Sequence, residues 1–406
     1  MTAAHGDVRE RLRRLRGMPQ LLPALGGLPP IFLVGGAVRD LLRGESGVDL
    51  DLAVEGDARS AARTIADRLG GQARDHERFG TATVRTDALA FDLAGTRRET
   101  YERPGALPTV EPAPLAEDLG RRDFSINAMA LGLSGDDLGH LYDPHGGSGD
   151  LGVGIVRVLH DGSFADDPTR LLRALRYEAR LGFAMDADTE KQARAAISNG
   201  APATVSGKRI ADELLDLLAE EKAAAGIRRM GELGLDRALA PELDADAQLV
   251  ASAGLVAGEV GADRALAGLA ALISSDPLAL VSWLDRLGLP AAEREAVLKA
   301  ASSAPLLVRE LRLEPGPSRL YDLLSGEPPE SLALTLALGA PSEPVMRWLR
   351  DLSRVRLEIA GRDLLEAGVP EGPAVGRGLA EALKRKLDGE ISGRDEELAA
   401  ALEAAR

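Results

Sequence analysis

Two kinds of secondary-structure signal divide this sequence near residue 160. Before that point, short apolar runs bounded by Gly, Pro or Asp alternate at the period of a strand, whereas beyond it helical spacing continues to the last residue. A helix is predicted over 57–69, with Asp57 as its N-cap. The strand predictions, of which the last two form a hairpin, are 31–34, 48–54, 82–86 and 89–93. The sequence therefore predicts an α+β protein, in which a small α/β unit is followed by an all-helical remainder.

Length and chain breakers predict the domain organisation. A chain of 406 residues is too long for one compact core and suits two or three domains. Breaker-rich stretches lie at 26–30 and near Pro241. The predicted segments are an N-terminal extension over 1–30, an α/β domain over 31–160, and helical regions over 161–240 and 241–406.

Composition excludes several kinds of chemistry. The chain has no cysteine, which removes disulfides, thiolate metal sites and cysteine nucleophiles. Its five histidines are scattered and form no helical metal-binding pair. Any catalytic metal must therefore be held by carboxylates.

Charge and hydropathy limit the partners and the compartment. The net charge of −15 argues against bulk electrostatic binding of nucleic acid, so any RNA contacts must be concentrated locally. No apolar run reaches the roughly 18 residues of a membrane span, and the charged start lacks an apolar signal core. We expect no membrane partner and a cytoplasmic protein.

A pair of acids is the first candidate for catalysis. Asp49 and Asp51 are two residues apart on a predicted strand, so both carboxylates point to the same face while Leu50 points into the core. Two such carboxylates can hold Mg²⁺, which takes its other ligands from water and substrate phosphates. Asp92, on a later strand, is either a third carboxylate of this site or a surface acid.

A glycine turn precedes the acids. Gly35 and Gly36 stand between a predicted strand and a helix start, where backbone N–H groups can approach a phosphate closely. Most glycine pairs are merely turns. Next to two aspartates at this distance, the pair favours a nucleotide site.

Two arginine-bearing segments add candidates for phosphate, ribose and base. In the segment 121–130, arginines including Arg122 can bridge triphosphate oxygens, while Asp123 and Asn127 suit ribose hydroxyls. In the segment 166–176, Asp166 or Asp167 is predicted to cap a helix with Pro168 in its first turn. Helical spacing then puts four arginines on one face: Arg170, Arg173, Arg176 and Arg180.

Asp167 and Arg170 are i and i+3 on this helix and can act as a pair. The acid offers only acceptors and the arginine only donors. Cytosine and adenine each present an amino donor beside a ring-nitrogen acceptor, which the pair can match. Guanine and uracil present a carbonyl beside a ring N–H, so they would be rejected because mismatched buried polar groups are costly.

These motifs together resemble the nucleotidyltransferase superfamily of DNA polymerase β, and more closely the bacterial class II tRNA nucleotidyltransferases and their poly(A) polymerase relatives. The resemblance is carried by 35–40 with Asp49 and Asp51, by 121–130, by 166–176, by a neck-like segment at 205–214 and by tail-like segments at 361–365 and 387–389. It implies a polymerase β-like head followed by a helical neck, body and tail. In that family the two aspartates bind two Mg²⁺ ions and catalyse.

The resemblance also implies partners and further site residues. It implies CTP and ATP as substrates and the tRNA 3′ end as the acceptor. The nucleotide would be bound by ten residues: Gly35, Gly36, Arg39, Arg122, Asp123, Asn127, Asp167, Arg170, Arg173 and Arg176. Basic residues that either contact RNA or lie in solvent are Lys208, Arg209, Lys384, Arg385 and Lys386.

Several related functions share these motifs. Enzymes restricted to CC or to the terminal A would carry all of them, and the linker over 96–119 does not distinguish between them. A poly(A) polymerase shares the head, although we would expect it to have a strongly basic extension. A non-catalytic RNA-binding module is the remaining alternative, against which the intact Asp49 and Asp51 argue.

Overall fold

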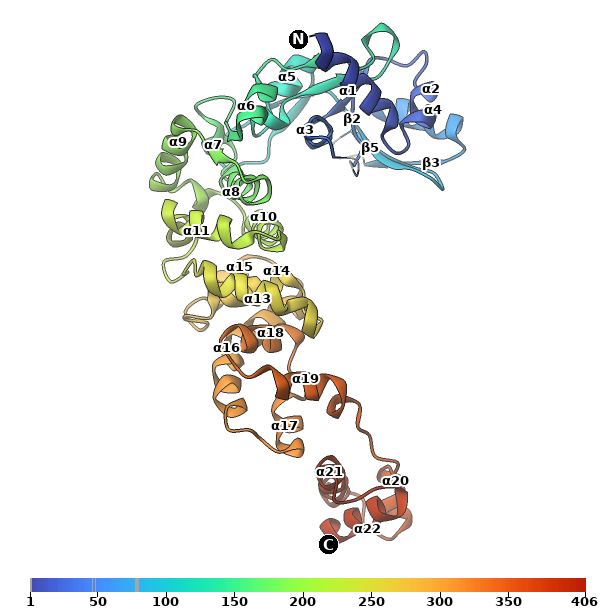
Figure 1. The fold of residues 1–406 in the computed structure, drawn as a ribbon, viewed down its shortest axis with the longest axis vertical. Helices are drawn as coiled ribbons and strands as arrows, with labels where there is room; N and C mark the ends of the chain where they lie inside the picture. Colours follow the sequence, from blue (N-terminus) through green and yellow to red (C-terminus); the bar gives the residue numbers. More distant parts are fainter. Residues whose placement is uncertain (1, 46, 48, 77–79) are drawn as a thin grey trace. The chain divides into compact units, whose positions relative to one another are not determined.

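The computed structural model describes residues 2–45, 47, 49–76 and 80–406 (Figure 1). Its contacts divide the chain into two compact units, each described separately below. The first comprises Met1–Ile210 with Glu232–Leu239, and the second comprises Ala211–Gly231 with Ala240–Arg406.

A seven-stranded mixed sheet forms the centre of the first unit. Its strand order is β3-β4-β5-β2-β1-β8-β9, and only the β2–β5 pair is parallel. The strands are β1 (Ile31–Val34), β2 (Asp51–Val54), β3 (Gln72–His76), β4 (Thr81–Arg85), β5 (Ala90–Gly95), β8 (Ala130–Gly132) and β9 (Leu141–Tyr142). Four helices accompany this part of the chain: α1 (Thr2–Arg14), α2 (Met18–Ala24), α3 (Gly36–Arg43) and α4 (Ala58–Leu69).

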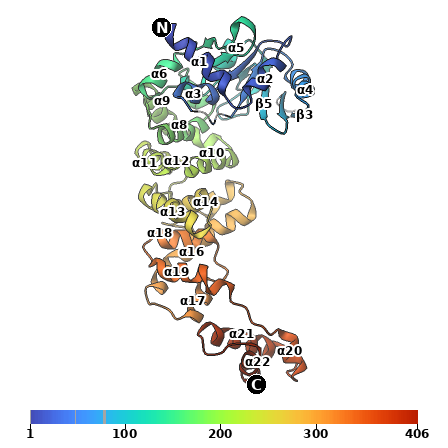
Figure 2. The same ribbon diagram turned by 45° about the vertical axis from the view of Figure 1, so that its right-hand side comes forward.

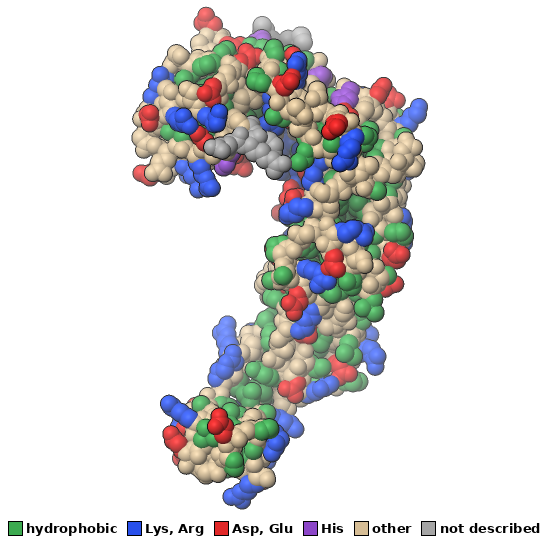
Figure 3. Space-filling model, turned by 180° about the vertical axis from the view of Figure 1, so that it is seen from behind, with side chains coloured by type: hydrophobic (Ala, Val, Ile, Leu, Met, Phe, Trp, Pro, Cys, Tyr) green, Lys and Arg blue, Asp and Glu red, His purple; other side chains and the backbone are tan. Residues whose placement is uncertain are grey.

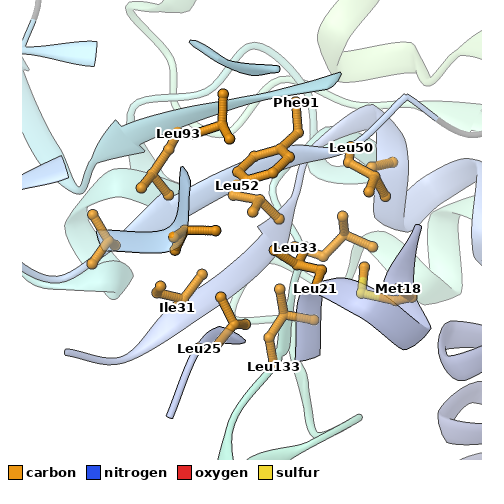
Figure 4. Close-up of a cluster of buried hydrophobic side chains, with 14 of the residues drawn as sticks. Met18, Leu21, Leu25, Ile31, Leu33, Leu50, Leu52, Phe91, Leu93 and Leu133 are labelled. Atoms are coloured by element: carbon orange, nitrogen blue, oxygen red, sulfur yellow. The ribbon is translucent and has the colours of Figure 1, made fainter. Parts of the chain in front are cut away.

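One face of the sheet forms the larger core, part of which Figure 4 draws. Alternate strand residues such as Leu33, Leu52 and Leu93 point into it, as the period of a strand requires. Residues from the first 30 positions also fill this core, including Met18 and Leu21 of α2. Part of the segment expected as an extension therefore belongs to the head.

The opposite face carries a smaller cluster and the candidate site. Phe32, Val34 and Ala53 pack there against α5 (Leu115–Gly120). Asp51 begins β2 two residues before Ala53 and therefore points to this same face. The sheet thus separates a buried apolar side from a partly open side that bears an acid.

Local sequence signals predicted several of these elements correctly. Strand β1 forms at the short apolar run 31–34, and the β4–β5 hairpin forms where strand signals at 82–86 and 89–93 indicated it. Helix α4 begins after Asp57, whose side chain accepts a hydrogen bond from the Arg59 N–H. The strand expected over 48–54 is shorter, because β2 begins at Asp51, and Val48 lies outside the described residues.

The rest of the first unit leads from the sheet to helices. The strands are two short pairs: β6 (Arg97–Thr100) with β7 (Thr109–Pro112), and β10 (Ile155–Val156) with β11 (Ala184–Met185). The helices are α6 (Gly147–Val153), α7 (Ser163–Asp166), α8 (Thr169–Leu181), α9 (Ala187–Ser198), the beginning of α10 (Gly207–Ala219) and α12 (Leu235–Leu239). Because β11 lies beyond residue 160, the prediction of an all-helical remainder is wrong at this one short strand.

The second unit is built from helices and their connections (Figures 1 and 2). They are α11 (Ala223–Leu233), which runs into the first unit, α13 (Ala247–Val260), α14 (Arg264–Ile273), α15 (Val281–Arg286), α16 (Ala291–Leu311), α17 (Pro317–Leu324), α18 (Pro329–Ala337), α19 (Ser342–Arg350), α20 (Gly361–Glu366), α21 (Pro373–Leu387) and α22 (Arg394–Ala405). The last three share a hydrophobic cluster of their own around Leu364 and Ala382. Within the described residues, no helix is long and apolar enough to cross a bilayer.

Basic side chains do not gather into one large patch on the face drawn in Figure 3. Lys and Arg lie there singly or in small groups among acidic and apolar side chains. This dispersal agrees with the net negative charge of the chain.

Candidate active site

A polar pocket of about 400 Å³ lies in the first unit and brings together residues from distant parts of the sequence. Its lining includes ten of the predicted site residues: Gly35, Gly36, Arg39, Asp51, Arg122, Asp123, Asn127, Asp167, Arg170 and Arg173. Glu99, Tyr101, Arg121 and Tyr177 complete it. Asp49, Asp92 and Arg176 are not among the lining residues.

The glycine turn shapes one wall of this pocket. Gly35 caps α3 with φ 67° and ψ −133°, a conformation that suits only glycine. A Cβ at this position would lie 2.7 Å from Nη1 of Arg122, so the missing side chain also makes room for that arginine. The turn therefore brings the backbone close to a guanidinium that can bind phosphate.

Asp49, Asp51 and Asp92 lie near one another on the sheet, and of the three only Asp51 lines the pocket. Asp51 is opposite Asp92 in the β2–β5 register, and Asp49 precedes β2 instead of lying within it. Asp49 and Asp51 are exposed and Leu50 between them is buried, as expected from alternation. Burial raises the pKa of Asp51, and repulsion from Asp92 and Asp49 adds to this rise, while Arg122 opposes it.

The arrangement of these acids limits how a metal could be held. Among the described residues, no group of three or more His, Asp or Glu side chains is arranged to hold a metal ion. The Oδ1 atom of Asp92 accepts a hydrogen bond of 2.6 Å from the Thr83 hydroxyl. Asp49 and Asp51 are therefore the candidate protein ligands of a metal ion. Its remaining ligands would have to come from water or substrate.

A buried arginine network forms the floor of the pocket. Arg39 donates to both oxygens of Asp40 at 2.8 and 2.9 Å and to Oδ1 of Asn127 at 2.7 Å. Burial alone would lower the pKa of Arg39, but the Asp40 carboxylate outweighs it and the pKa is raised. Arg39 thus stays charged inside the protein.

Asp123 connects this floor to helix α8. Its Oδ2 accepts from Nε and Nη2 of Arg173 at 2.9 and 2.6 Å, and its Oδ1 accepts from Asn127 Nδ2 and the Phe124 N–H. Burial would raise the pKa of this carboxyl, but Arg173 and the hydrogen bonds lower it overall. Asp123 is therefore an ionised anchor whose two oxygens are already engaged.

Arg121 and Arg122 share one buried acid. Asp118 accepts from Arg121 at 2.9 and 3.0 Å and from Arg122 at 3.0 Å, and these arginines lower its pKa against the effect of burial. Arg121 also donates to Glu99 at 2.8 Å. The Tyr101 hydroxyl donates to the Glu99 carboxylate. Burial of the hydroxyl, together with the charge of Glu99, raises the pKa of Tyr101 to about 12.

The predicted base-reading pair occupies the pocket, but each partner is held by other groups. Oδ1 of Asp167 accepts from the N–H and hydroxyl of Thr169, the first residue of α8, although Pro168 and not the predicted acid occupies the N-cap position of this helix. Arg170 is buried and donates to the Ser163 hydroxyl at 2.6 Å and to the Arg121 carbonyl at 2.8 Å. Arg170 is therefore less solvated than the predicted arginine face implied.

Two aromatic residues and one acid of the lining were missed by sequence reasoning. Tyr177 lies 5.2 Å from the Arg39 guanidinium and 5.8 Å from that of Arg173, measured to the ring centroid. Its position four residues after Arg173 on one helix was a usable signal. Spacing along the chain could not place Glu99 in the pocket, because its contact with Arg121 spans 22 residues, and Tyr101 in turn donates to Glu99.

The residues predicted to contact RNA fall into different environments. Arg209 lies beside the pocket and donates to Asp167 at 2.8 Å, whereas Lys208 is exposed. In the second unit, Arg385 pairs with Glu381 and Glu403, Lys386 pairs with Glu397, and Lys384 is exposed.

Two known family models match parts of this chain. The family described as "Poly A polymerase head domain" matches residues 31–157, and "Probable RNA and SrmB- binding site of polymerase A" matches residues 182–246. An A-adding tRNA nucleotidyltransferase of Geobacter sulfurreducens is 35% identical over 390 residues, which are 91% of this chain. This chain spans only 44% of that relative's length.

Other relatives match along nearly their whole length. A CC-adding tRNA nucleotidyltransferase of Deinococcus radiodurans is 33% identical over 90% of this chain and 87% of its own. The Thermotoga maritima CCA-adding enzyme complexed with tRNA is 30% identical with a TM-score of 0.78, over 98% of this chain and 99% of that one. The chain therefore belongs to the tRNA nucleotidyltransferase family that carries a poly(A) polymerase head domain.

Proposed function

We propose that this chain adds C, A or both to the 3′ end of tRNA from CTP and ATP, without a nucleic-acid template. One observation carries the proposal: Asp51, Arg122 and the pair Asp167 and Arg170 line the same pocket. The pocket thus combines three kinds of group. Asp51 suits a metal ion, Arg122 suits a triphosphate, and Asp167 with Arg170 suits the edge of a base. Relatives named for A, CC and CCA addition support the same activity.

Nucleotidyltransferases of this family normally need divalent metal ions. In our proposal, Asp49 and Asp51 hold two Mg²⁺ ions, with water and nucleotide phosphates as the other ligands. The donor set fits, because both residues are exposed and the pKa of Asp51, raised first by partial burial of the carboxyl and then by repulsion from Asp92 and Asp49, would be lowered by a bound cation. Bound there, Mg²⁺ would lower the pKa of the attacking hydroxyl and neutralise the departing pyrophosphate.

The protein's own groups would bind and orient the triphosphate. The Gly36 N–H at the start of α3 and the guanidinium groups of Arg122 and Arg173 suit its oxygens, whereas the Gly35 N–H is already donated to the Met129 carbonyl. Because Asp123 and Asn127 already bond to Arg173 and Arg39, their main contribution would be to fix those two guanidinium groups. One N–H of the Asn127 amide is left for a ribose hydroxyl, since the other is donated to Asp123.

The reaction would be a single displacement at phosphorus. The 3′-hydroxyl oxygen of the tRNA attacks the α-phosphate of CTP or ATP, the bond to the β-phosphate breaks, and pyrophosphate leaves. Asp167 and Arg170 would select C or A at the base, as an acceptor and a donor.

The helical regions would supply the RNA-binding surface. Following the predicted divisions, we assign 31–160 to the nucleotidyltransferase head, 161–240 to base recognition and 241–406 to tRNA. RNA duplexes are usually held through shape and backbone contacts, which an acidic chain with dispersed basic groups can still provide. Lys208 and Lys384 are exposed candidates for such contacts. We place the activity in the cytoplasm.

One assay separates this function from its alternatives. Purified protein with Mg²⁺ is given tRNA ending before CCA, after C, or after CC, with each nucleotide separately, and the products are sequenced. Stepwise completion of CCA supports the full activity, and addition limited to CC or to the last A identifies the restricted variants. Long A tails would indicate a poly(A) polymerase, and no incorporation on any RNA would reject the enzyme in favour of an RNA-binding module.

A further inference from the structure

The two carboxylate oxygens of Asp167 have different surroundings. Oδ1 accepts three hydrogen bonds, from the Thr169 N–H at 3.1 Å, the Thr169 hydroxyl at 2.6 Å and Nη2 of Arg209 at 2.8 Å. Among the residues that the structure describes, none donates a hydrogen bond to Oδ2. The side chain lines the pocket, so one oxygen is anchored while the other is left for a ligand.

Arg209 provides the part of this anchor that comes from outside α8. It stands in the first turn of α10 with a side chain that is 26% exposed. Besides binding Asp167, its Nη1 donates to the Gly105 carbonyl at 3.3 Å. Held at two points, the planar guanidinium has little freedom to rotate away from the carboxylate.

The Gly105 carbonyl is itself fixed in place. Gly105 has φ 71°, and a Cβ there would lie 2.4 Å from the Thr204 hydroxyl oxygen. Its N–H donates to the Asp166 carbonyl at 3.3 Å, next to the residue that Arg209 holds. Arg209 thus joins two groups of the protein, the Asp167 carboxylate and the Gly105 carbonyl.

We infer that Arg209 is a positioning residue for base selection, which orients Asp167 so that Oδ2 meets the amino group of cytosine or adenine. The inference rests on the proposed function. A fixed acceptor at this point repels the carbonyl oxygen that uracil or guanine would place there. Without Arg209, the carboxylate keeps only its Thr169 contacts and can turn, so the repulsion weakens and the accepted bases lose an aligned acceptor.

The test compares Arg209→Ala, Arg209→Lys and wild type in single-nucleotide addition to tRNA, with kcat and KM measured for each of the four nucleotides. Arg209→Ala should reduce the preference for the accepted nucleotide over UTP by about tenfold or more, the size of one charge-assisted hydrogen bond. The loss should appear mainly in KM. Arg209→Lys should recover part of it, because an ammonium can still donate to Oδ1. The matched control is Arg14→Ala, which removes an exposed arginine paired with Glu10 and should leave selectivity unchanged.

A second variant acts on the same oxygen. Thr169→Val removes the hydroxyl donor to Oδ1 with little change of shape, and it should shift selectivity in the same direction by a smaller factor. Unchanged nucleotide preference in both folded variants, or an equal slowing with every nucleotide, would overturn the inference while leaving the proposed function intact. Absence of addition by the wild-type protein would instead reject the proposed function and this inference with it.

Discussion

A single methyl group at Gly35 should disrupt one wall of the pocket. Its φ of 67° with ψ −133° is accessible almost only to glycine, and a Cβ would meet Arg122 at 2.7 Å. We expect Gly35→Ala to destabilise the fold by about 1–3 kcal/mol and to displace Arg122 from Asp118. Urea unfolding measures the first effect. Gly36→Ala is the matched control, since its Cβ would lie 3.4 Å from Arg39 at a helical position, and an equal loss of stability there would contradict the argument.

Asp51 should matter for chemistry and not for folding. The native state raises its pKa above the ordinary 3.8, so the native carboxyl holds its proton more tightly than the unfolded one. Stability from this group is present below pH 3.8 and is lost as pH rises through the native pKa. At neutral pH, Asp51→Asn should therefore be at least as stable as wild type in thermal unfolding, yet it should abolish nucleotide addition, as should Asp49→Asn. Near-normal turnover in either variant would remove the metal assignment.

At the scale of single elements, sequence patterns correctly predicted the strands and helix starts that depend on contacts between neighbouring residues. A short apolar run indicated β1, strand signals at 82–86 and 89–93 indicated the β4–β5 hairpin, and Asp57 was found as a cap, because each depends on a few neighbouring residues. An acid was predicted to cap α8, but Pro168 occupies its N-cap position, and Asp167 just before it accepts from the Thr169 N–H. The strand holding Asp51 was predicted too long, because β2 begins at Asp51 and leaves Asp49 and Leu50 outside it.

Contacts between elements were beyond the reach of these signals. No strand was predicted in the linker over 96–119, yet it contains the β6–β7 hairpin and brings Glu99 and Tyr101 to the pocket. Arg209 was predicted either to contact RNA or to lie in solvent, and no local pattern indicated its partner Asp167, 42 residues earlier. Such pairings are set by tertiary packing, which spacing along one helix does not record.

The tie between Asp123 and α8 gives a prediction at the element scale. Two bonds from Arg173 and the lowered pKa mean that the ionised carboxyl stabilises the fold. Asp123→Asn should cost about 1.5–3 kcal/mol at pH 7, the range for hydrogen bonds to charged groups. Because the native pKa lies below 3.8, this stability is present above pH 3.8 and is lost as pH falls through the native value. Urea unfolding from pH 7 to pH 3 should show the gap between wild type and variant closing on acidification, and a constant gap would contradict the ion pair.

At the scale of the whole molecule, the change of pattern near residue 160 correctly predicted a mixed sheet region followed by helices. The place of the first 30 residues was harder to predict. Their spacing indicated an amphipathic stretch, but only the folded sheet offers the surface that Leu12, Met18 and Leu21 cover. The sequence pattern predicts which face of an amphipathic helix is apolar. It does not predict the surface on which that face is buried, because this surface is formed by residues far away in the sequence.

The last three helices allow the proposed division of labour between pocket and RNA-binding surface to be tested on the whole chain. Helices α20 to α22 have their own hydrophobic cluster, and one bond that links them to the rest of the second unit runs from the Ser318 N–H to Asp388 at 2.9 Å. A chain ending at residue 355 should therefore keep a cooperative unfolding transition. Every residue lining the pocket lies between 35 and 177, so the affinity for CTP and ATP, measured by calorimetry, should not change. If the tail binds tRNA, the KM for tRNA should rise about tenfold or more as phosphate and backbone contacts are lost. An unchanged KM for tRNA would remove the tail from the binding surface, and lost nucleotide affinity would show that the pocket depends on helices it does not touch.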